Sequence, residues 1–128
     1  MHHVHTNPIK NRMYIILKDG NTSDIRAYVN TVENACGDLP YNFSCVVVLD
    51  KKGIVRQSDI DLLFNTMDLI YAYGADRIIL VRKSNGNSNF FQPNLLNFKT
   101  CFTVENAMNI QEAENILDQR HDAVVYAQ

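Results

Sequence analysis

A short run of apolar, mostly β-branched residues at 45–49, Cys-Val-Val-Val-Leu, constrains the fold more than any other part of the sequence. Strands that are apolar at every position are typical of parallel sheets covered on both faces, because neither side of such a strand meets water. We therefore expect a strand over 44–49 that lies inside a sheet. A polar stretch at 50–57 follows it, and then apolar residues at helical spacing over 58–73.

The helix predicted over 58–73 begins at Ser58, whose hydroxyl can accept a hydrogen bond from a first-turn N–H, so we expect Ser58 to be its N-cap. Asp59 and Asp61 follow where the helix dipole favours negative charge. Apolar residues also lie outside the main stripe and leave only a narrow polar strip at Asp61, Asn65 and Asp68. Such a helix is covered on more than one side, either by its own chain or by a partner.

The rest of the chain alternates in the same way. Apolar patterns predict strands over 13–17, 77–82 and 98–104, the last with one solvated face and therefore at a sheet edge. Helical periodicity predicts a helix between Thr22 and Gly37, and Asn109 followed by Glu112 resembles a capping box that begins a last helix. This order predicts an α/β fold: a single layered domain with a mostly parallel central sheet and helices packed on it.

The two ends of the chain do not fit this alternation. Residues 1–11 are polar and carry three histidines, and the sequence predicts a flexible tail there. Histidine is a good metal ligand, but closely spaced histidines on a flexible tail rarely make a closed site, so no metal site is predicted. The α/β domain is expected over 12–120, and a C-terminal tail with a small apolar cluster over 121–128.

Size and charge exclude several classes of function. A chain of 128 residues is one ordinary domain, and twelve basic against fourteen acidic residues argue against binding of nucleic acid through bulk charge. No apolar run reaches the roughly 20 residues that span a bilayer, and no secretory signal is evident. The three cysteines are an odd set without CxxC spacing, so a reducing cytoplasm is the expected location.

Motifs for catalysis and cofactor binding are missing from the sequence. Neither the turn after the first predicted strand nor the one after 44–49 is rich in glycine, and there is no P-loop. Cys45 lies inside an apolar strand, where a thiol is not a nucleophile. Asp50 ends a strand as the phosphorylated aspartate of receiver domains does, but their acidic pair and lysine lack counterparts here. We therefore predict no catalytic residue and no cofactor.

The strand ending at Asp50, the loop after it, the helix beginning at Ser58, and Gly74 before the next strand together resemble the STAS domain of sulfate transporters and anti-sigma factor antagonists. The resemblance is one of pattern and covers roughly 12–119. In phosphorylatable members the loop ends in Asp-Ser-Ser/Thr-Gly, whose serine or threonine is phosphorylated by a partner kinase. Here Gln-Ser-Asp-Ile stands at 57–60, so Ser58 or Asp59 occupies the acceptor position, without the motif's first acidic residue and glycine.

The resemblance implies a non-catalytic binding or regulatory module that acts through protein–protein contacts. The residues expected to contact the partner are Asp50, Lys51, Lys52, Arg56, Phe90 and Phe91. The alternative is a small-ligand-binding α/β protein or a small enzyme with its site at the carboxyl ends of the strands, where Asp19, Asp50 and Lys83 would converge. A third hypothesis is a homodimer through the helix over 58–73, with Phe90 and Phe91 close by.

Overall fold

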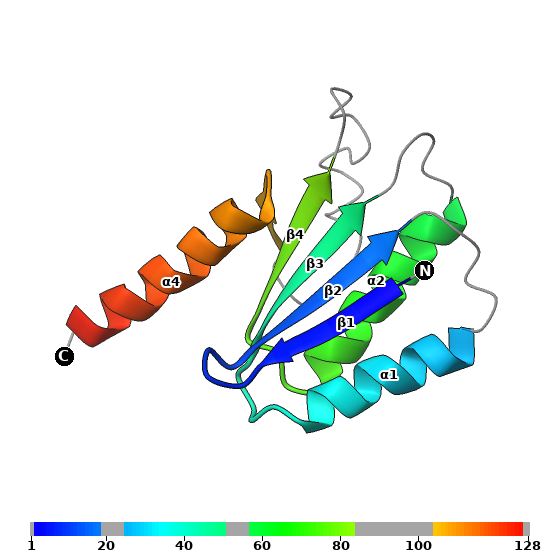
Figure 1. The fold of residues 1–128 in the computed structure, drawn as a ribbon, viewed down its shortest axis with the longest axis horizontal. Helices are drawn as coiled ribbons and strands as arrows, with labels where there is room; N and C mark the ends of the chain where they lie inside the picture. Colours follow the sequence, from blue (N-terminus) through cyan, green and yellow to red (C-terminus); the bar gives the residue numbers. More distant parts are fainter. Residues whose placement is uncertain (1, 19–24, 51–56, 84–103, 127–128) are drawn as a thin grey trace.

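The computed structural model describes residues 2–18, 25–50, 57–83 and 104–126 (Figure 1). The described elements, in chain order, are β1 (His2–Asn7), β2 (Arg12–Lys18), α1 (Ile25–Gly37), β3 (Ser44–Asp50), α2 (Gln57–Ala72), β4 (Arg77–Lys83), β5 (Val104–Ala107) and α4 (Ile110–Tyr126). Strands and helices alternate from β2 to β4, so the prediction of an α/β fold is confirmed. No helix in these four ranges is both long and apolar enough to cross a membrane.

The five described strands form one sheet in the order β1-β2-β3-β4-β5. The pairings from β2 to β5 are parallel, whereas β1 runs antiparallel to β2. The sheet is therefore mixed, which corrects the prediction of a mostly parallel sheet. The predicted strand over 44–49 is observed as β3 and lies at the centre, with its middle five residues buried.

The strand β1 takes the place of the flexible tail that the sequence predicts over 1–11. Its ladder with β2 runs from His2 opposite Leu17 to Asn7 opposite Arg12. The chain reverses through a tight turn in which the Asn11 N–H donates to the Pro8 carbonyl at 3.2 Å, and Asn11 has a φ of 51°. Asparagine tolerates this left-handed conformation better than most residues, which suits it to the turn. Only one apolar residue, Val4, packs from β1 against the core, so hydropathy alone does not reveal the strand.

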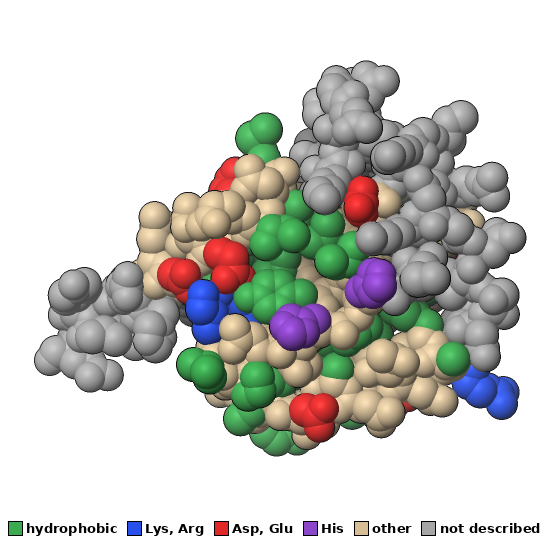
Figure 2. Space-filling model, in the orientation of Figure 1, with side chains coloured by type: hydrophobic (Ala, Val, Ile, Leu, Met, Phe, Trp, Pro, Cys, Tyr) green, Lys and Arg blue, Asp and Glu red, His purple; other side chains and the backbone are tan. Residues whose placement is uncertain are grey.

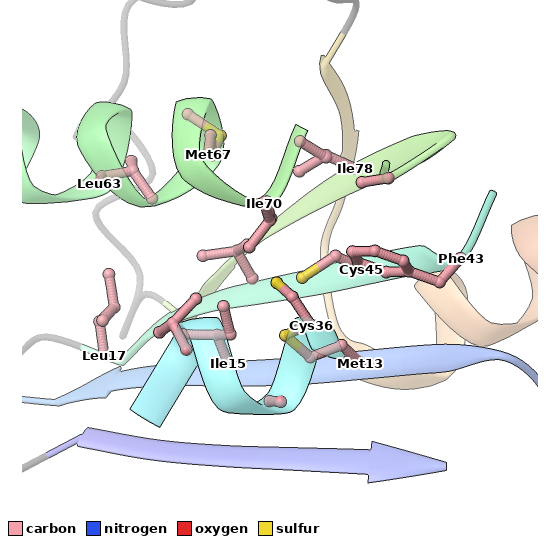
Figure 3. Close-up of a cluster of buried hydrophobic side chains, with 14 of the residues drawn as sticks. Met13, Ile15, Leu17, Cys36, Phe43, Cys45, Leu63, Met67, Ile70 and Ile78 are labelled. Atoms are coloured by element: carbon pink, nitrogen blue, oxygen red, sulfur yellow. The ribbon is translucent and has the colours of Figure 1, made fainter. Parts of the chain in front are cut away.

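The larger core lies between the sheet and the helices α1 and α2 (Figure 3). The strands present alternate residues to this face, and both helices cover it. The cluster includes Met13, Ile15, Leu17, Cys36, Phe43, Cys45, Leu63, Met67, Ile70 and Ile78. The helices also contact each other, and a buried hydrogen bond of 2.8 Å joins Tyr28 Oη and Thr66 Oγ1. Because the Thr66 hydroxyl donates to the Leu62 carbonyl at 2.7 Å, Tyr28 is the donor to Thr66.

Packing within the chain covers much of α2. Leu62 and Leu69, which lie outside the predicted main stripe, are half-buried and pack against the core, while Asp61, Asn65 and Asp68 are exposed. The polar strip is therefore where the sequence predicts it. The hypothesis of a homodimer through α2 also needs Phe90 and Phe91, and both lie outside the described residues.

The opposite face of the sheet packs against α4 (Figure 1). Ala113 and Leu117 of this helix belong to a second buried cluster, whose strand members are Val46, Val48, Ile79, Val81 and Ala107. The helix extends to Tyr126, where the sequence predicts a tail from 121 onwards. At the sheet edge, β5 begins at Val104, and the rest of the strand predicted over 98–104 lies outside the described residues.

Candidate functional site

The carboxyl ends of β2, β3 and β4 meet at one edge of the sheet, where α/β proteins commonly place their sites. The register there pairs Lys18 with Asp50 and Asp50 with Lys83. Neighbouring strands are about 4.8 Å apart, so the backbone brings two basic positions next to one acidic position. The sequence predicts Asp50 and Lys83 at this edge and misses Lys18, because it lies just beyond the strand predicted over 13–17, where the sequence indicates a turn. Asp19, the third predicted member, lies outside the described residues.

The first turn of α2 follows this edge in the chain. The helix begins at Gln57, so Ser58 lies within its first turn instead of capping it, which corrects the prediction for Ser58. Ser58 is exposed, and Asp59 is next to it in the same turn. Gln57 Nε2 donates a hydrogen bond of 3.0 Å to Oδ1 of Asp61, which lies one turn further along the helix, and this contact is exposed. The described polar side chains here, those of Gln57, Ser58 and Asp61, are thus accessible to water.

Of the six residues predicted to bind a partner, the structure describes Asp50. Asp50 is half-buried at the end of β3. The others, Lys51, Lys52, Arg56, Phe90 and Phe91, lie outside the described residues. The structure therefore places Asp50 at the end of β3 and Ser58 in the first turn of α2, the next element in the chain.

The two described cysteines are buried in the larger core. Burial raises the pKa of the Cys36 thiol to about 11, with the Glu33 charge adding to the effect. Burial also raises the pKa of Cys45 well above its ordinary value. Both thiols are therefore protonated at neutral pH and are poor nucleophiles. Within the described ranges, no group of three or more histidine, cysteine, aspartate or glutamate side chains is placed to hold a metal ion.

A polar network that sequence reasoning misses joins the β1–β2 hairpin to α4. Arg12, only 4% exposed, lies at its centre, with Nη2 3.0 Å from Asp118 Oδ1 and Nη1 3.0 Å from Glu114 Oε2. The second contact is an ion pair without hydrogen-bond geometry. Tyr14 Oη donates to Glu114 Oε1 at 2.6 Å, and Lys10 Nζ donates to Glu114 Oε2 at 3.1 Å. These residues are about 100 positions apart in the chain, so no local motif reveals them.

The network changes the acidity of its members. Burial disfavours the charged form of Glu114, but hydrogen bonds from Tyr14 and Lys10, together with the charge of Arg12, outweigh it and lower the pKa of that carboxyl. Burial, together with the hydrogen bond to Glu114, raises the pKa of Tyr14 to about 12. Since Glu114 is ionised and Tyr14 is neutral at pH 7, the network holds α4 with charge-assisted hydrogen bonds.

A second ion pair lies across the neighbouring strands β4 and β5. Arg77 Nε donates to Glu105 Oε2 at 2.8 Å, and Arg77 Nη2 donates to the other oxygen of the same carboxylate. This two-point contact fixes the short edge strand to β4. The guanidinium groups of Arg12 and Arg77 are therefore both bound by carboxylates of the chain, which favours a structural role for them.

Comparisons with known proteins do not assign the chain to a family. No family model matches it, and no curated protein or solved structure matches it either. Its function has to be inferred from its own residues and their placement.

Proposed function

We propose that this protein is a non-catalytic binding or regulatory module of STAS-like fold, which acts through protein–protein contacts. The contact surface is the end of β3 together with the first turn of α2. Ser58 and Asp59 stand there at the positions that correspond to the phosphorylated residue of the family the sequence resembles. In this chain the partner recognises the unmodified turn, because the full phosphorylation motif is not present.

The observation that carries this proposal is the exposure of Gln57 and Ser58 in the first turn of α2, the element that follows the central strand of the sheet. Its position is fixed by the core, since Leu63 and Met67 of the same helix are fully buried. Its polar groups remain accessible: Ser58 and Asp61 are both exposed. A rigid element that presents accessible polar groups suits recognition by another protein.

The proposal is tested by affinity purification of the full chain from the cells that produce it, with bound proteins quantified by mass spectrometry. The variant Ser58→Tyr places a bulky neutral side chain on the surface. The matched control is Asn30→Tyr, at an exposed position in α1. We expect a set of proteins enriched with the wild type and with Asn30→Tyr, and lost with Ser58→Tyr. Equal enrichment with all three chains would show that the surface lies elsewhere.

A second candidate function is the binding of a small anionic ligand at the carboxyl ends of the strands. The register of Lys18, Asp50 and Lys83 favours it, because two basic positions flank one acidic position at the edge where α/β proteins bind ligands. Native mass spectrometry of the purified chain tests it. A bound anion that is retained by the wild type and lost from Lys83→Ala would support this function, and would count against the purely protein-binding one.

A further inference from the structure

Two histidines on β1 occupy the same face of a paired strand. His3 is opposite Ile16 and His5 is opposite Tyr14 in the ladder with β2. Successive side chains of a strand point to opposite faces, so residues two positions apart lie on the same one. Both histidines are exposed, and Figure 2 shows histidine side chains on the surface of a face that also carries acidic and basic side chains.

Contacts on both faces of β1 fix the orientation of the strand, so that His3 and His5 stay on the exposed face. Val4, between the two histidines, packs on the opposite side against the larger core. The His5 ring lies against the Tyr14 ring, with centroids 6.0 Å apart and an angle of 31° between the planes. Tyr14 is itself held by its hydrogen bond to Glu114. The pair is therefore attached to a sheet, and the flexible-tail argument against a metal site does not apply to it.

We propose that His3 and His5 form a two-histidine binding site for a divalent transition-metal ion of the zinc class. Their Cα atoms are about 6.8 Å apart, at two residues along a strand. Two nitrogen atoms bound to one tetrahedral ion at about 2.0 Å are about 3.3 Å apart. The two imidazole rings can bring their nitrogen atoms to this separation by rotating toward each other about their side-chain bonds. The remaining coordination positions are open to water or to a further ligand, so the site is of the open kind.

Zinc-class ions suit this pair better than magnesium or calcium. Neutral imidazole nitrogen is a preferred ligand of zinc, copper and nickel, whereas magnesium and calcium take oxygen ligands. The neighbouring carboxylates Glu114 and Asp118 are already paired with Arg12 and Lys10. Among the described residues, by contrast, the His3 and His5 imidazoles have no hydrogen bond or ion pair that would hold them away from a metal ion.

Zinc titration of the metal-free full chain by calorimetry tests the proposal, with imidazole NMR signals of the wild type as a second readout. We expect saturable Zn²⁺ binding that shifts the signals of His3 and His5. His3→Gln and His5→Gln should each abolish it, whereas His121→Gln should leave it unchanged. The double variant His5→Thr/Thr6→His keeps the composition of the segment but moves one histidine to the other face, and it should also lose binding.

Two results would overturn the proposal. One is full Zn²⁺ affinity in the His5→Thr/Thr6→His chain, because binding would then depend only on the number of histidines in the segment. The other is a wild type whose His3 and His5 signals do not move on addition of Zn²⁺, a result that holds whether or not any variant folds. Circular dichroism of each variant confirms that lost binding does not reflect lost structure.

Discussion

The guanidinium of Arg12 lies 3.0 Å from the carboxylate of Asp118, 106 residues further along the chain, and joins the second strand to the last helix. Arg12 is buried, whereas Asp118 is half exposed. Among the α4 side chains that the structure describes, Ala113 and Leu117 are buried against the sheet and Ile116 packs beside them. The charged network adds a second, polar attachment of α4 to the sheet.

Replacing Arg12 with alanine should lower the free energy of unfolding by about 2–4 kcal/mol, because Glu114 would keep its charge in a poorly solvated place without its buried partner. Lys10→Ala is the matched control, since Lys10 binds the same carboxylate from an exposed position. Its effect should be under about 1 kcal/mol. Urea denaturation measures both, and equal losses would contradict the central place of Arg12.

The lowered pKa of Glu114 gives stability a dependence on pH. Because this pKa is lower in the folded than in the unfolded chain, the unfolded state binds the proton first as the pH falls. The stabilisation is present above the ordinary value of 4.5 and is lost as the pH falls below it, through the pKa of the folded chain. Urea denaturation from pH 7 to pH 3 should therefore show a flatter decline for Glu114→Gln than for the wild type. Parallel declines would show that Glu114 does not titrate differently in the two states.

Two residues near helix starts should differ in their contribution to stability. Asn109 immediately precedes α4, and its Oδ1 accepts the Glu112 N–H at 2.7 Å, so Asn109→Ala should destabilise by about 1 kcal/mol. Ser58 lies inside the first turn of α2 and is exposed, so Ser58→Ala should change stability by less than about 0.5 kcal/mol. Thermal or urea unfolding of the two variants compares them directly. If Ser58→Ala lowered the free energy of unfolding as much as Asn109→Ala does, Ser58 would have to be regarded as an N-cap after all.

How much the sequence predicts depends on whether a feature is local and apolar. The strand β3 and the cap at Asn109 are predicted correctly, because apolar continuity and the Asn-to-Glu spacing are both read over a few residues. The strand β1 is missed because it is held by backbone hydrogen bonds, which leave no trace in the side-chain pattern, and because Val4 is its one apolar side chain packed on the core. The Arg12 network is missed because its partners are distant in sequence. At the candidate site, the sequence predicts the end of β3 and the start of α2, but not the register that adds Lys18.

The buried thiols should be unreactive in the folded chain. Burial raises the pKa of Cys36 to about 11 and that of Cys45 well above its ordinary value, so almost no thiolate is present at pH 7.5, about the pH of a standard assay. We expect iodoacetamide to leave both unmodified under native conditions and to modify both in urea. Peptide mass spectrometry after a short exposure measures this. Rapid native labelling of Cys45 would mean that the centre of the sheet opens readily.

The turn after α2 depends on a glycine. Gly74 has a φ of 108°, and a Cβ there would meet the ring of Tyr41, which is 79% exposed. Gly74→Ala should therefore destabilise in two ways: about 1–2 kcal/mol from the backbone conformation, and a smaller amount from displacing the ring. In a Tyr41→Ala background only the backbone part should remain, because the ring is gone. A double-mutant cycle by urea denaturation separates the two parts, and a Gly74→Ala effect that vanishes in that background would show that the left-handed conformation itself carries no strain.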